Sequence, residues 1–431
     1  MIPKTMSLPE RSGRESLAFV QRLFRDVPRR DFAVRLWDGT LWEGEPGTPP
    51  RFTLHLRHPG ALRRMFWRVS QISLGEAFIY GDFDVKGDLE AAFDLAEGML
   101  HPSLSWSEKM RCAGFLLGLP APPRAGNARR THLHGTLHSR RRDARAISYH
   151  YDVSNDFYRL WLDPEMVYSC AYFADAAESL ESAQRRKLDY ICRKLRLRPG
   201  ERLLDIGCGW GSLLLHAVRN YGVDAVGITL SRAQAELARE RIAAEGLAER
   251  CHVEIMDYRE LDEPECFDKL VSVGMFEHVG EGRLGGYFER AFRLLRPGGV
   301  FLNHGIASTH TAQLPPGESF IDRYVFPDGE LLPIATTLGT AEASGFEVRD
   351  LESLREHYAL TLRHWVRRLE QAYAQACRVT DEVTCRIWRL YMAGSAQGFR
   401  VGRLNLYQAL LYKPGGDSSL PLTRADWYLP A

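Results

Sequence analysis

The residues best suited to chemistry form a glycine-rich turn between a predicted strand and a predicted helix. Asp205-Ile-Gly-Cys-Gly-Trp-Gly follows an apolar run that begins at Arg202, and a helical pattern begins at Ser212. The three glycines allow a tight turn and a close approach of the backbone to a ligand. The helix N-terminus behind them favours a negatively charged group. The turn therefore predicts a cofactor site, a feature that dinucleotide-binding folds share.

The next predicted strand separates the cofactor classes. A dinucleotide enzyme usually ends this strand with an acidic residue that binds the ribose hydroxyls. Here the strand ends in Gly227-Ile-Thr-Leu-Ser-Arg-Ala-Gln, which offers Thr229, Ser231 and Gln234 and no acid. The pattern therefore argues against a dinucleotide.

Strands and helices alternate around this turn from residue 147 onward. Strands are predicted at 202–207, 224–229, 253–256, 269–273, 300–304 and 405–412, and helical segments from 212, over 231–245, and at 365–369 and 383–399. Repeated β-α-β units with apolar strands imply a parallel sheet that is covered on both faces. The sequence therefore predicts an α/β domain that positions the turn at one edge of its sheet.

Residues 1–121 have a different character. Residues 32–37 and 52–57 alternate apolar and polar, as half-buried strands do, and residues 89–99 look helical. No cluster of residues in this region carries obvious chemistry. We therefore expect a smaller α+β domain that serves as a scaffold or contacts lipid.

Residues 122–146 separate these two regions, and residues 414–431 form a C-terminal tail. The separating segment is rich in arginine and poor in apolar residues; its arginines are 124, 129, 130, 140, 141, 142 and 145. One interpretation is a solvated, disordered linker. The other is an electrostatic contact with an anionic membrane, where each basic side chain contributes on the order of 1 kcal/mol. The two interpretations are compatible.

Composition limits the function classes. The formal net charge of +1 argues against nucleic acid as a partner. The eight cysteines are scattered without a Cys-x-x-Cys pair, which suits a reducing cytoplasm and offers no spacing for a metal site. No apolar run approaches the ~18 residues of a membrane span, and residues 1–10 lack a signal-peptide pattern. We expect a cytoplasmic protein that meets any lipid substrate as a peripheral membrane protein.

The cofactor motifs resemble the cyclopropane fatty acid synthase family of S-adenosylmethionine-dependent methyltransferases. Further matching segments are His150-Tyr-Asp-Val-Ser-Asn-Asp-Phe-Tyr, Met166-Val-Tyr-Ser-Cys-Ala-Tyr-Phe, Phe276-Glu-His-Val-Gly, Asn303-His-Gly-Ile and His357-Tyr-Ala-Leu-Thr-Leu. The resemblance spans about residues 147–413. It implies a class I methyltransferase fold, which is Rossmann-like with a mostly parallel seven-stranded sheet. Residues 1–121 more weakly resemble the N-terminal lipid-binding domain of the longer bacterial members.

The resemblance implies which residues bind S-adenosylmethionine. The matching positions are Tyr168, Ser169, Asp205, Gly207, Gly209, Trp210, Thr229, Ser231, Gln234, Asp257 and Tyr258. Two of them keep an alternative. Asp205 could support the turn without touching a ligand, and Asp257 could cap a loop.

The resemblance also implies a base. An alkene that attacks a sulfonium methyl group leaves a carbocation, and ring closure removes a proton from the new methyl group. Family members use a bound bicarbonate for this step, and the matching positions are Cys170, Glu277, His304, Ile306 and Tyr358. His304, Tyr358 and the backbone N–H groups of Cys170 and Ile306 can donate to the anion, and Glu277 can accept from its hydroxyl. Each of these residues could instead be ordinary core packing.

Aromatic side chains accompany the same motifs. They are Tyr168, Tyr172, Phe173 and Phe276. Their ring faces could each stabilise a passing cation by roughly 0.5–2 kcal/mol, or they could simply pack. The segment 157–161, Phe-Tyr-Arg-Leu-Trp, is a candidate lid or membrane-facing helix.

The implied substrate is an unsaturated phospholipid acyl chain, reached by transient contact with a membrane surface, and a homodimer is compatible with the resemblance. Rival functions stay open. The product could be a methyl- or methylene-branched chain, the acceptor could be a small amine or a ring carbon, or the protein could bind lipid with an inactive methyltransferase domain. Ser395 stands where many members have a cysteine, which suggests a divergent subgroup.

Overall fold

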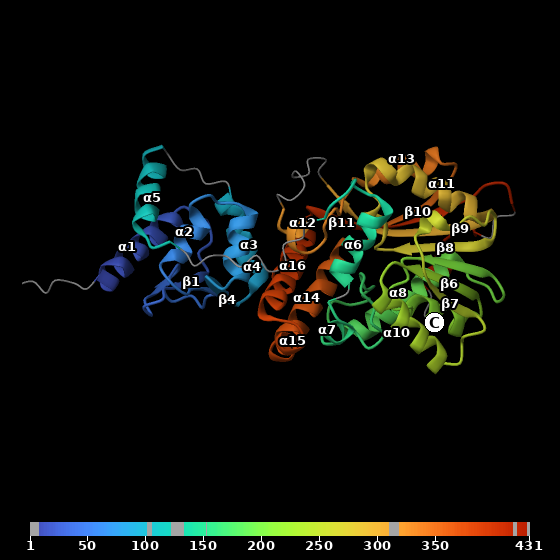
Figure 1. Ribbon diagram of the computed structural model, residues 1–431, viewed down its shortest axis with the longest axis horizontal. Helices are drawn as coiled ribbons and strands as arrows, with labels where there is room; N and C mark the ends of the chain where they lie inside the picture. Colours follow the sequence, from blue (N-terminus) through green and yellow to red (C-terminus); the bar gives the residue numbers. More distant parts are fainter. Residues whose placement is uncertain are drawn as a thin grey trace, which may run out of the picture. The chain divides into compact units, whose positions relative to one another are not determined.

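The computed structural model describes residues 8–100, 106–121, 133–151, 153–309, 319–416 and 420–428. The chain divides into two compact units (Figure 1). The first comprises Met1–Arg130, Gly317–Phe320 and Glu382–Gln397, and the second comprises Thr131–Pro316, Ile321–Asp381 and Gly398–Ala431. The assignment of residues 382–397 to the first unit is not apparent from the sequence, where they look like part of the catalytic domain.

The first unit is built on a four-stranded sheet with the order β2-β1-β3-β4. Its strands are β1 (Phe32–Arg35), β2 (Leu41–Glu43), β3 (Phe52–Leu56) and β4 (Phe83–Gly87). Its helices include α1 (Leu8–Leu23), α2 (Gly60–Phe66), α3 (Gln71–Ile79), α4 (Leu89–Leu100) and α5 (Trp106–Gly118). The predicted strands at 32–37 and 52–57 are confirmed as β1 and β3. They pair in parallel, and the side chains of β3 alternate between buried and half-buried.

Helix α16 (Glu382–Arg400) contributes its residues up to Gln397 to this first unit. The buried guanidinium of Arg386 donates hydrogen bonds to the carbonyl oxygens of Phe78 (2.7 Å) and Phe83 (2.8 Å). It also lies over the ring of Phe78. These bonds satisfy a buried charge, which would otherwise carry a large desolvation cost.

The second unit contains a seven-stranded sheet with the order β10-β11-β9-β8-β5-β6-β7. Its strands are β5 (Arg202–Ile206), β6 (Asp224–Thr229), β7 (Cys251–Ile255), β8 (Phe267–Val273), β9 (Leu295–Ser308), β10 (Glu347–Ser353) and β11 (Leu404–Tyr412). Strands β9, β8, β5, β6 and β7 pair in parallel, whereas β11 is antiparallel to both β9 and β10. The predicted mostly parallel, seven-stranded α/β fold is confirmed.

Helices cover both faces of this sheet. The longer ones are α6 (Arg140–Tyr151), α8 (Leu180–Leu195), α9 (Ser212–Tyr221), α10 (Arg232–Ala244), α11 (Leu284–Leu294), α13 (Ile334–Ala343) and α14 (Arg355–Gln371), and the shorter ones are α7 (Asn155–Arg159), α12 (Phe320–Tyr324) and α15 (Tyr373–Val379). Leu203 of β5 belongs to a buried cluster that contains residues of α8, α9 and α10, whereas its neighbour Leu204 belongs to a cluster that contains residues of α11 and α13. Alternate residues of each central strand therefore enter two separate cores, as burial on both faces requires.

Two expectations about the start of the second unit are wrong. Residues 140–146, which the sequence suggested to be the end of a solvated linker, form the first turns of helix α6; residues 122–132 lie outside the described residues. The aromatic segment 157–161 does not face outward. Phe157, Tyr158 and Trp161 are each 0% exposed, so their rings belong to the core rather than to a lid or a membrane contact.

Within the described ranges, no helix is both long and apolar enough to span a bilayer.

Candidate active site

A pocket lies at the carboxyl ends of β5 and β6, where a doubly wound sheet binds its ligands. The turn after β5 supplies its floor. Gly207 and Gly209 have φ values of +87° and +55°, in the left-handed region that favours glycine. A Cβ added at Gly207 would lie 2.7 Å from the Cβ of Met275, so a side chain there would collide with the segment that follows β8. Glycine is therefore required at this position both by the positive φ and by the close approach of Met275.

Asp205 occupies the penultimate position of β5 and lines this pocket. The residue is 2% exposed, and Oδ1 of its carboxyl has no hydrogen-bond partner among the described residues. Burial raises the pKa of Asp205 to about 7, and the nearby Lys187 ammonium opposes this rise. An unsatisfied buried acceptor is costly, so it indicates that a ligand group donates to it.

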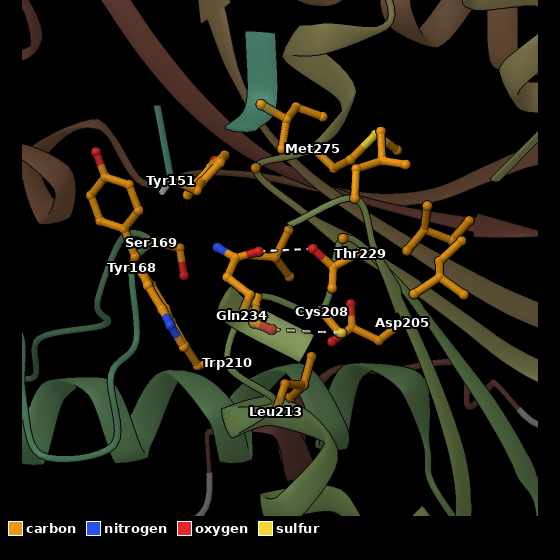
Figure 2. A pocket seen from close by; sticks show the side chains of 18 of the residues that line it. Tyr151, Tyr168, Ser169, Asp205, Cys208, Trp210, Leu213, Thr229, Gln234 and Met275 are labelled. Atoms are coloured by element: carbon orange, nitrogen blue, oxygen red, sulfur yellow. Dashed lines mark hydrogen bonds between the residues drawn. The ribbon is translucent and has the colours of Figure 1, made fainter. Parts of the chain in front are cut away.

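The end of β6 and the start of α10 form the next wall. Thr229 Oγ1 donates a hydrogen bond of 2.8 Å to Gln234 Oε1, and both side chains line the pocket (Figure 2). Ser231 is different, because its hydroxyl caps α10 by accepting from the backbone N–H of Gln234 at 3.2 Å. Ser231 is not among the pocket-lining residues; the role that the structure gives it is to cap the helix, and its contact with the cofactor stays a prediction.

The segment before α8 faces these residues across the pocket. Figure 2 shows Tyr168, Ser169 and Trp210 on one side and Thr229 and Asp205 on the other. The indole Nε1 of Trp210 donates to Asn155 Oδ1 at 2.8 Å, which fixes the ring against the turn.

Lys187 on α8 is a pocket residue that the sequence motifs did not single out. Its side chain is 2% exposed, and its Nζ donates to Ser169 Oγ at 2.8 Å. Burial lowers the pKa of Lys187 to about 8. The signal lay in helical periodicity, because Lys187 falls on the same face as the buried Ala183, Leu188 and Ile191. A buried lysine on an apolar helix face is unusual, and it therefore marks Lys187 as a candidate functional residue.

Residues of α6 and of the segment after β7 complete the lining. Asp257 and Tyr258 are both present, as predicted. The carboxylate of Asp257 accepts from the backbone N–H of Arg259 at 2.9 Å and from its guanidinium at 2.5 Å and 2.8 Å. Arg259 in turn donates to Asp143 of α6 at 2.9 Å. The alternative interpretation of Asp257 as a loop cap therefore holds, and its carboxylate also ties this segment to α6.

The five candidate catalytic residues are not pocket-lining, but two are adjacent in the sequence to residues that are. Glu277 stands between Met275 and His278, and Cys170 follows Ser169. Glu277 Oε1 accepts from the backbone N–H of Ile306 at 2.8 Å, while its Oε2 has no partner among the described residues. The N–H of Ile306 thus serves the Glu277 carboxyl rather than being open to an anion, contrary to the sequence interpretation.

His304 on β9 is 1% exposed, and its Nδ1 lies 3.2 Å from Nε2 of Gln408. Its Nε2 is a second buried polar atom without a partner in the described part of the chain. Burial raises the pKa of Glu277 to about 7 and lowers that of His304 well below its usual value. Both groups are therefore able to be neutral near physiological pH.

Cys170 and Tyr358 are the remaining candidates. The Cys170 thiol is fully buried, lies 3.2 Å from the carbonyl oxygen of Ala171, and has its pKa raised far above the usual range by burial. A thiolate is therefore not available, and a role for Cys170 falls to its backbone. Tyr358 on α14 is 7% exposed, and its ring packs on Phe399 with centroids 4.7 Å apart.

The aromatic residues of the motifs divide into two groups. Tyr168 lines the pocket, in a position to face a bound group. Tyr172 instead stacks on His357 at 4.7 Å between ring centroids and donates to Glu352. Phe173 stacks on His364. Tyr172 and Phe173 are therefore better described as packing residues than as residues that stabilise a passing cation.

Comparisons with known proteins agree with this fold. Residues 138–409 match the mycolic acid cyclopropane synthetase family, and residues 19–101 match a domain family of unknown function. A probable fatty acid methyltransferase of Pseudomonas putida is 43% identical over 400 residues, which cover 92% of this chain and 95% of the relative. The cyclopropane-fatty-acyl-phospholipid synthase of Escherichia coli K12 is 40% identical over 276 residues, 64% of this chain and 69% of the relative.

A solved structure is similar as well. The crystal structure of mycolic acid cyclopropane synthase CmaA1 complexed with SAH and CTAB superposes with a TM-score of 0.59 at 37% identity, covering 63% of this chain and 98% of that chain. Fold and pocket together define a class I, S-adenosylmethionine-dependent methyltransferase. Within that class, the chain belongs to the mycolic acid cyclopropane synthetase family.

Proposed function

We propose that the protein transfers a methylene group from S-adenosylmethionine to the double bond of an unsaturated phospholipid acyl chain, with bicarbonate as the base. The observation that carries this proposal is a pair of buried, unsatisfied polar atoms, Glu277 Oε2 and His304 Nε2. Buried polar groups almost always have partners. Their presence beside the cofactor pocket supports a small polar species as the missing partner.

The pocket residues fit S-adenosylmethionine. Its amino-acid end carries an ammonium and a carboxylate, and the pocket offers both the unsatisfied Asp205 Oδ1 and the Lys187 ammonium. Gly207 and Gly209 of the glycine turn both line this pocket, so their backbone is available to the cofactor. When bound, this cofactor supplies an electrophilic methyl group. The chain's own contribution is to bind and orient it and to exclude water.

The residues near Glu277 also fit bicarbonate, which supplies a base when bound. Glu277 is held by Ile306 N–H so that Oε2 can accept from a hydroxyl, and His304 Nε2 can donate to an oxygen if it carries the proton. When bound, S-adenosylmethionine would give its methyl group to one alkene carbon as its methyl–sulfur bond breaks and S-adenosylhomocysteine leaves, and the adjacent carbon would become a cation. Transfer of a proton from the new methyl group to bicarbonate would then allow the ring to close.

The acyl substrate implies contact with a membrane surface. Moving an acyl chain through water costs about 0.8 kcal/mol per CH2 group, so the chain must pass from bilayer to protein. In the first unit, Trp106, Met110 and Leu117 lie on one face of α5 and are 77%, 56% and 56% exposed. Exposed Lys109 and Arg111 accompany them on the helix. This combination supports transient binding to an anionic bilayer.

A second candidate function is a methyltransferase that yields a methyl- or methylene-branched fatty acid. The observation in its favour is the strong similarity over nearly the whole chain to the probable fatty acid methyltransferase of Pseudomonas putida. It would share the cofactor and the first cation, but a hydride shift would move the cation to the methylated carbon, and proton loss next to that carbon would leave a methylene group or a methyl-branched alkene. Ser395, which stands where many family members have a cysteine, lies in the part of α16 that belongs to the first unit. This departure from the family pattern favours the alternative function.

Glu277→Gln tests the proposed base site. Gln retains an oxygen for the Ile306 N–H but presents a donor where Oε2 accepted. We expect S-adenosylmethionine affinity within a few-fold of wild type and a loss of rate of roughly 10²-fold or more. Bicarbonate should stimulate a depleted wild-type enzyme and rescue the variant poorly. Full activity of the variant without bicarbonate would exclude the base site.

The product separates the two functions. NMR of lipid incubated with the wild-type enzyme should show upfield cyclopropyl protons. A branched chain would exclude the synthase and leave the methyltransferase.

A further inference from the structure

His304 and Gln408 are a directly opposed pair on two antiparallel strands. His304 of β9 pairs with Gln408 of β11 in the sheet register. Both side chains are 1% exposed, and Gln408 Nε2 lies 3.2 Å from His304 Nδ1. Gln408, which contacts the imidazole, therefore comes from the neighbouring strand and lies outside the motifs identified in the sequence.

The contact decides where the imidazole carries its proton. The amide nitrogen of glutamine can only donate, so His304 Nδ1 must accept. A neutral imidazole has one N–H, which must then be at Nε2. Burial and the ammonium groups of Lys187 and Lys194 on α8 all lower the pKa of His304, so the neutral imidazole is favoured over the doubly protonated form. His304 is therefore a neutral donor through Nε2, the atom that has no partner among the described residues.

We propose that Gln408 is a positioning residue that holds His304 in the Nε2–H tautomer and so makes it a hydrogen-bond donor to the anion of the base site. This inference rests on the proposed function. The opposite tautomer would turn a lone pair toward an anion and repel it. A charged imidazolium would bind the anion more strongly but would weaken it as a base. A neutral donor therefore suits an anion that must still accept a proton.

The direct test is ¹⁵N NMR of the full-length protein labelled at histidine, with His304→Asn to identify the His304 signals. Near neutral pH, we expect Nδ1 of His304 to be unprotonated and Nε2 to be protonated in the wild-type protein. Gln408→Glu places an acceptor opposite Nδ1 and should move the proton to that atom. A protonated Nδ1 in the wild-type protein would mean that the amide is reversed, and it would overturn the proposal.

Activity provides the second readout. Gln408→Glu should lower kcat by about tenfold or more, the effect of one lost charge-assisted hydrogen bond, with S-adenosylmethionine affinity unchanged. Gln408→Leu, which removes the amide but keeps an apolar fill, should lose less because the imidazole can still adopt the active tautomer. Equal kcat values for Gln408→Glu and wild type would overturn the positioning role.

The experiments distinguish a failure of the proposed base site from a failure of the proposed role of Gln408. If bicarbonate does not stimulate the depleted wild-type enzyme, the proposed base site is wrong, whatever the tautomer. If bicarbonate stimulates the enzyme but Nδ1 carries the proton, the role of Gln408 is wrong and the base site stands.

Discussion

Nζ of Lys187 donates a hydrogen bond of 2.8 Å to Oγ of Ser169, across the wall of the cofactor pocket. The two residues come from α8 and from the segment before it, and both line the pocket. Asp205, with its unsatisfied Oδ1, lines the same cavity. The Lys187 ammonium and the Asp205 carboxyl are thus both available to bind the carboxylate and the ammonium group of an amino-acid ligand.

We expect Lys187→Met to weaken S-adenosylmethionine binding by about tenfold or more, because a charge-assisted hydrogen bond is lost. Methionine keeps the apolar stem, so the fold should survive. Since burial lowers the pKa of Lys187 to about 8, wild-type affinity should also fall as the pH rises above that value. Isothermal titration calorimetry measures both effects. The exposed Lys109→Met is the matched control, and an unchanged dissociation constant in Lys187→Met would exclude a cofactor contact.

Asp205 should give the unliganded protein a distinctive pH dependence. Its pKa is about 7 in the folded state, against about 4 in an unfolded chain. Between these values the folded state binds more protons at Asp205, so the contribution of this residue to stability is greatest below about pH 4 and falls as the pH rises to about 7, by up to about 4 kcal/mol. Asp205→Asn should remove this component and be more stable than wild type at pH 8.

Urea unfolding at several pH values measures this effect. Asp156→Asn, at an exposed carboxylate, should retain the wild-type slope. A parallel pH dependence in Asp205→Asn and wild type would show that the Asp205 carboxyl is not desolvated as described.

Local patterns in the sequence were enough to predict the central sheet and the glycine turn. The strand predicted at 224–229 is β6 without change, because a short apolar run between turn signals is decided by its own residues. Ten of the eleven predicted cofactor residues line one pocket. Most of them lie at or just after the carboxyl ends of the parallel strands β5, β6 and β7, whereas Tyr168 and Ser169 come from the segment before α8. The exception, Ser231, caps α10, and its contact with the cofactor stays a prediction, because a helix cap and a ligand contact use the same residue type.

Features set by distant parts of the chain could not be predicted. In the sequence, Phe157 and Trp161 look like part of an exposed aromatic stripe. In the structure, other parts of the second unit bury both side chains. Residues 382–397 join the first unit through contacts such as Arg386 with Phe78, about three hundred positions apart. Gln408 carries no motif, and only strand pairing places it opposite His304.

The burial of Trp161 makes a prediction about stability. Trp161→Ala should destabilise the protein by about 3–5 kcal/mol, the usual cost of truncating a buried aromatic ring. A membrane-facing tryptophan would cost far less. Trp67→Ala, at a ring that is 46% exposed, is the matched control and should change the unfolding midpoint little. Equal effects of the two substitutions would contradict the buried position of Trp161.

Arg142 tests whether the arginine-rich segment has a structural role. Its guanidinium makes a two-pronged contact with the carboxylate of Asp328, at 2.6 Å and 2.7 Å. The same helix, α6, contributes Asp143, Ile147 and Tyr151 to the pocket. Because the pair is largely buried, breaking it should release the start of α6 and weaken S-adenosylmethionine binding by about tenfold. Asp328→Asn should have a similar effect, and combining it with Arg142→Met should add little.

Arg141→Met is the control for this series, because Arg141 is an exposed residue on the same helix. It should leave cofactor affinity unchanged. Binding to anionic vesicles should show the reverse order, since an exposed arginine is available to lipid phosphates and Arg142 is engaged with Asp328. Amide hydrogen exchange over residues 140–151 supplies the structural readout. Faster exchange in Arg142→Met but not in Arg141→Met would assign the ion pair to α6, whereas equal exchange in both would leave Arg142 without a structural role and return it to the membrane interpretation.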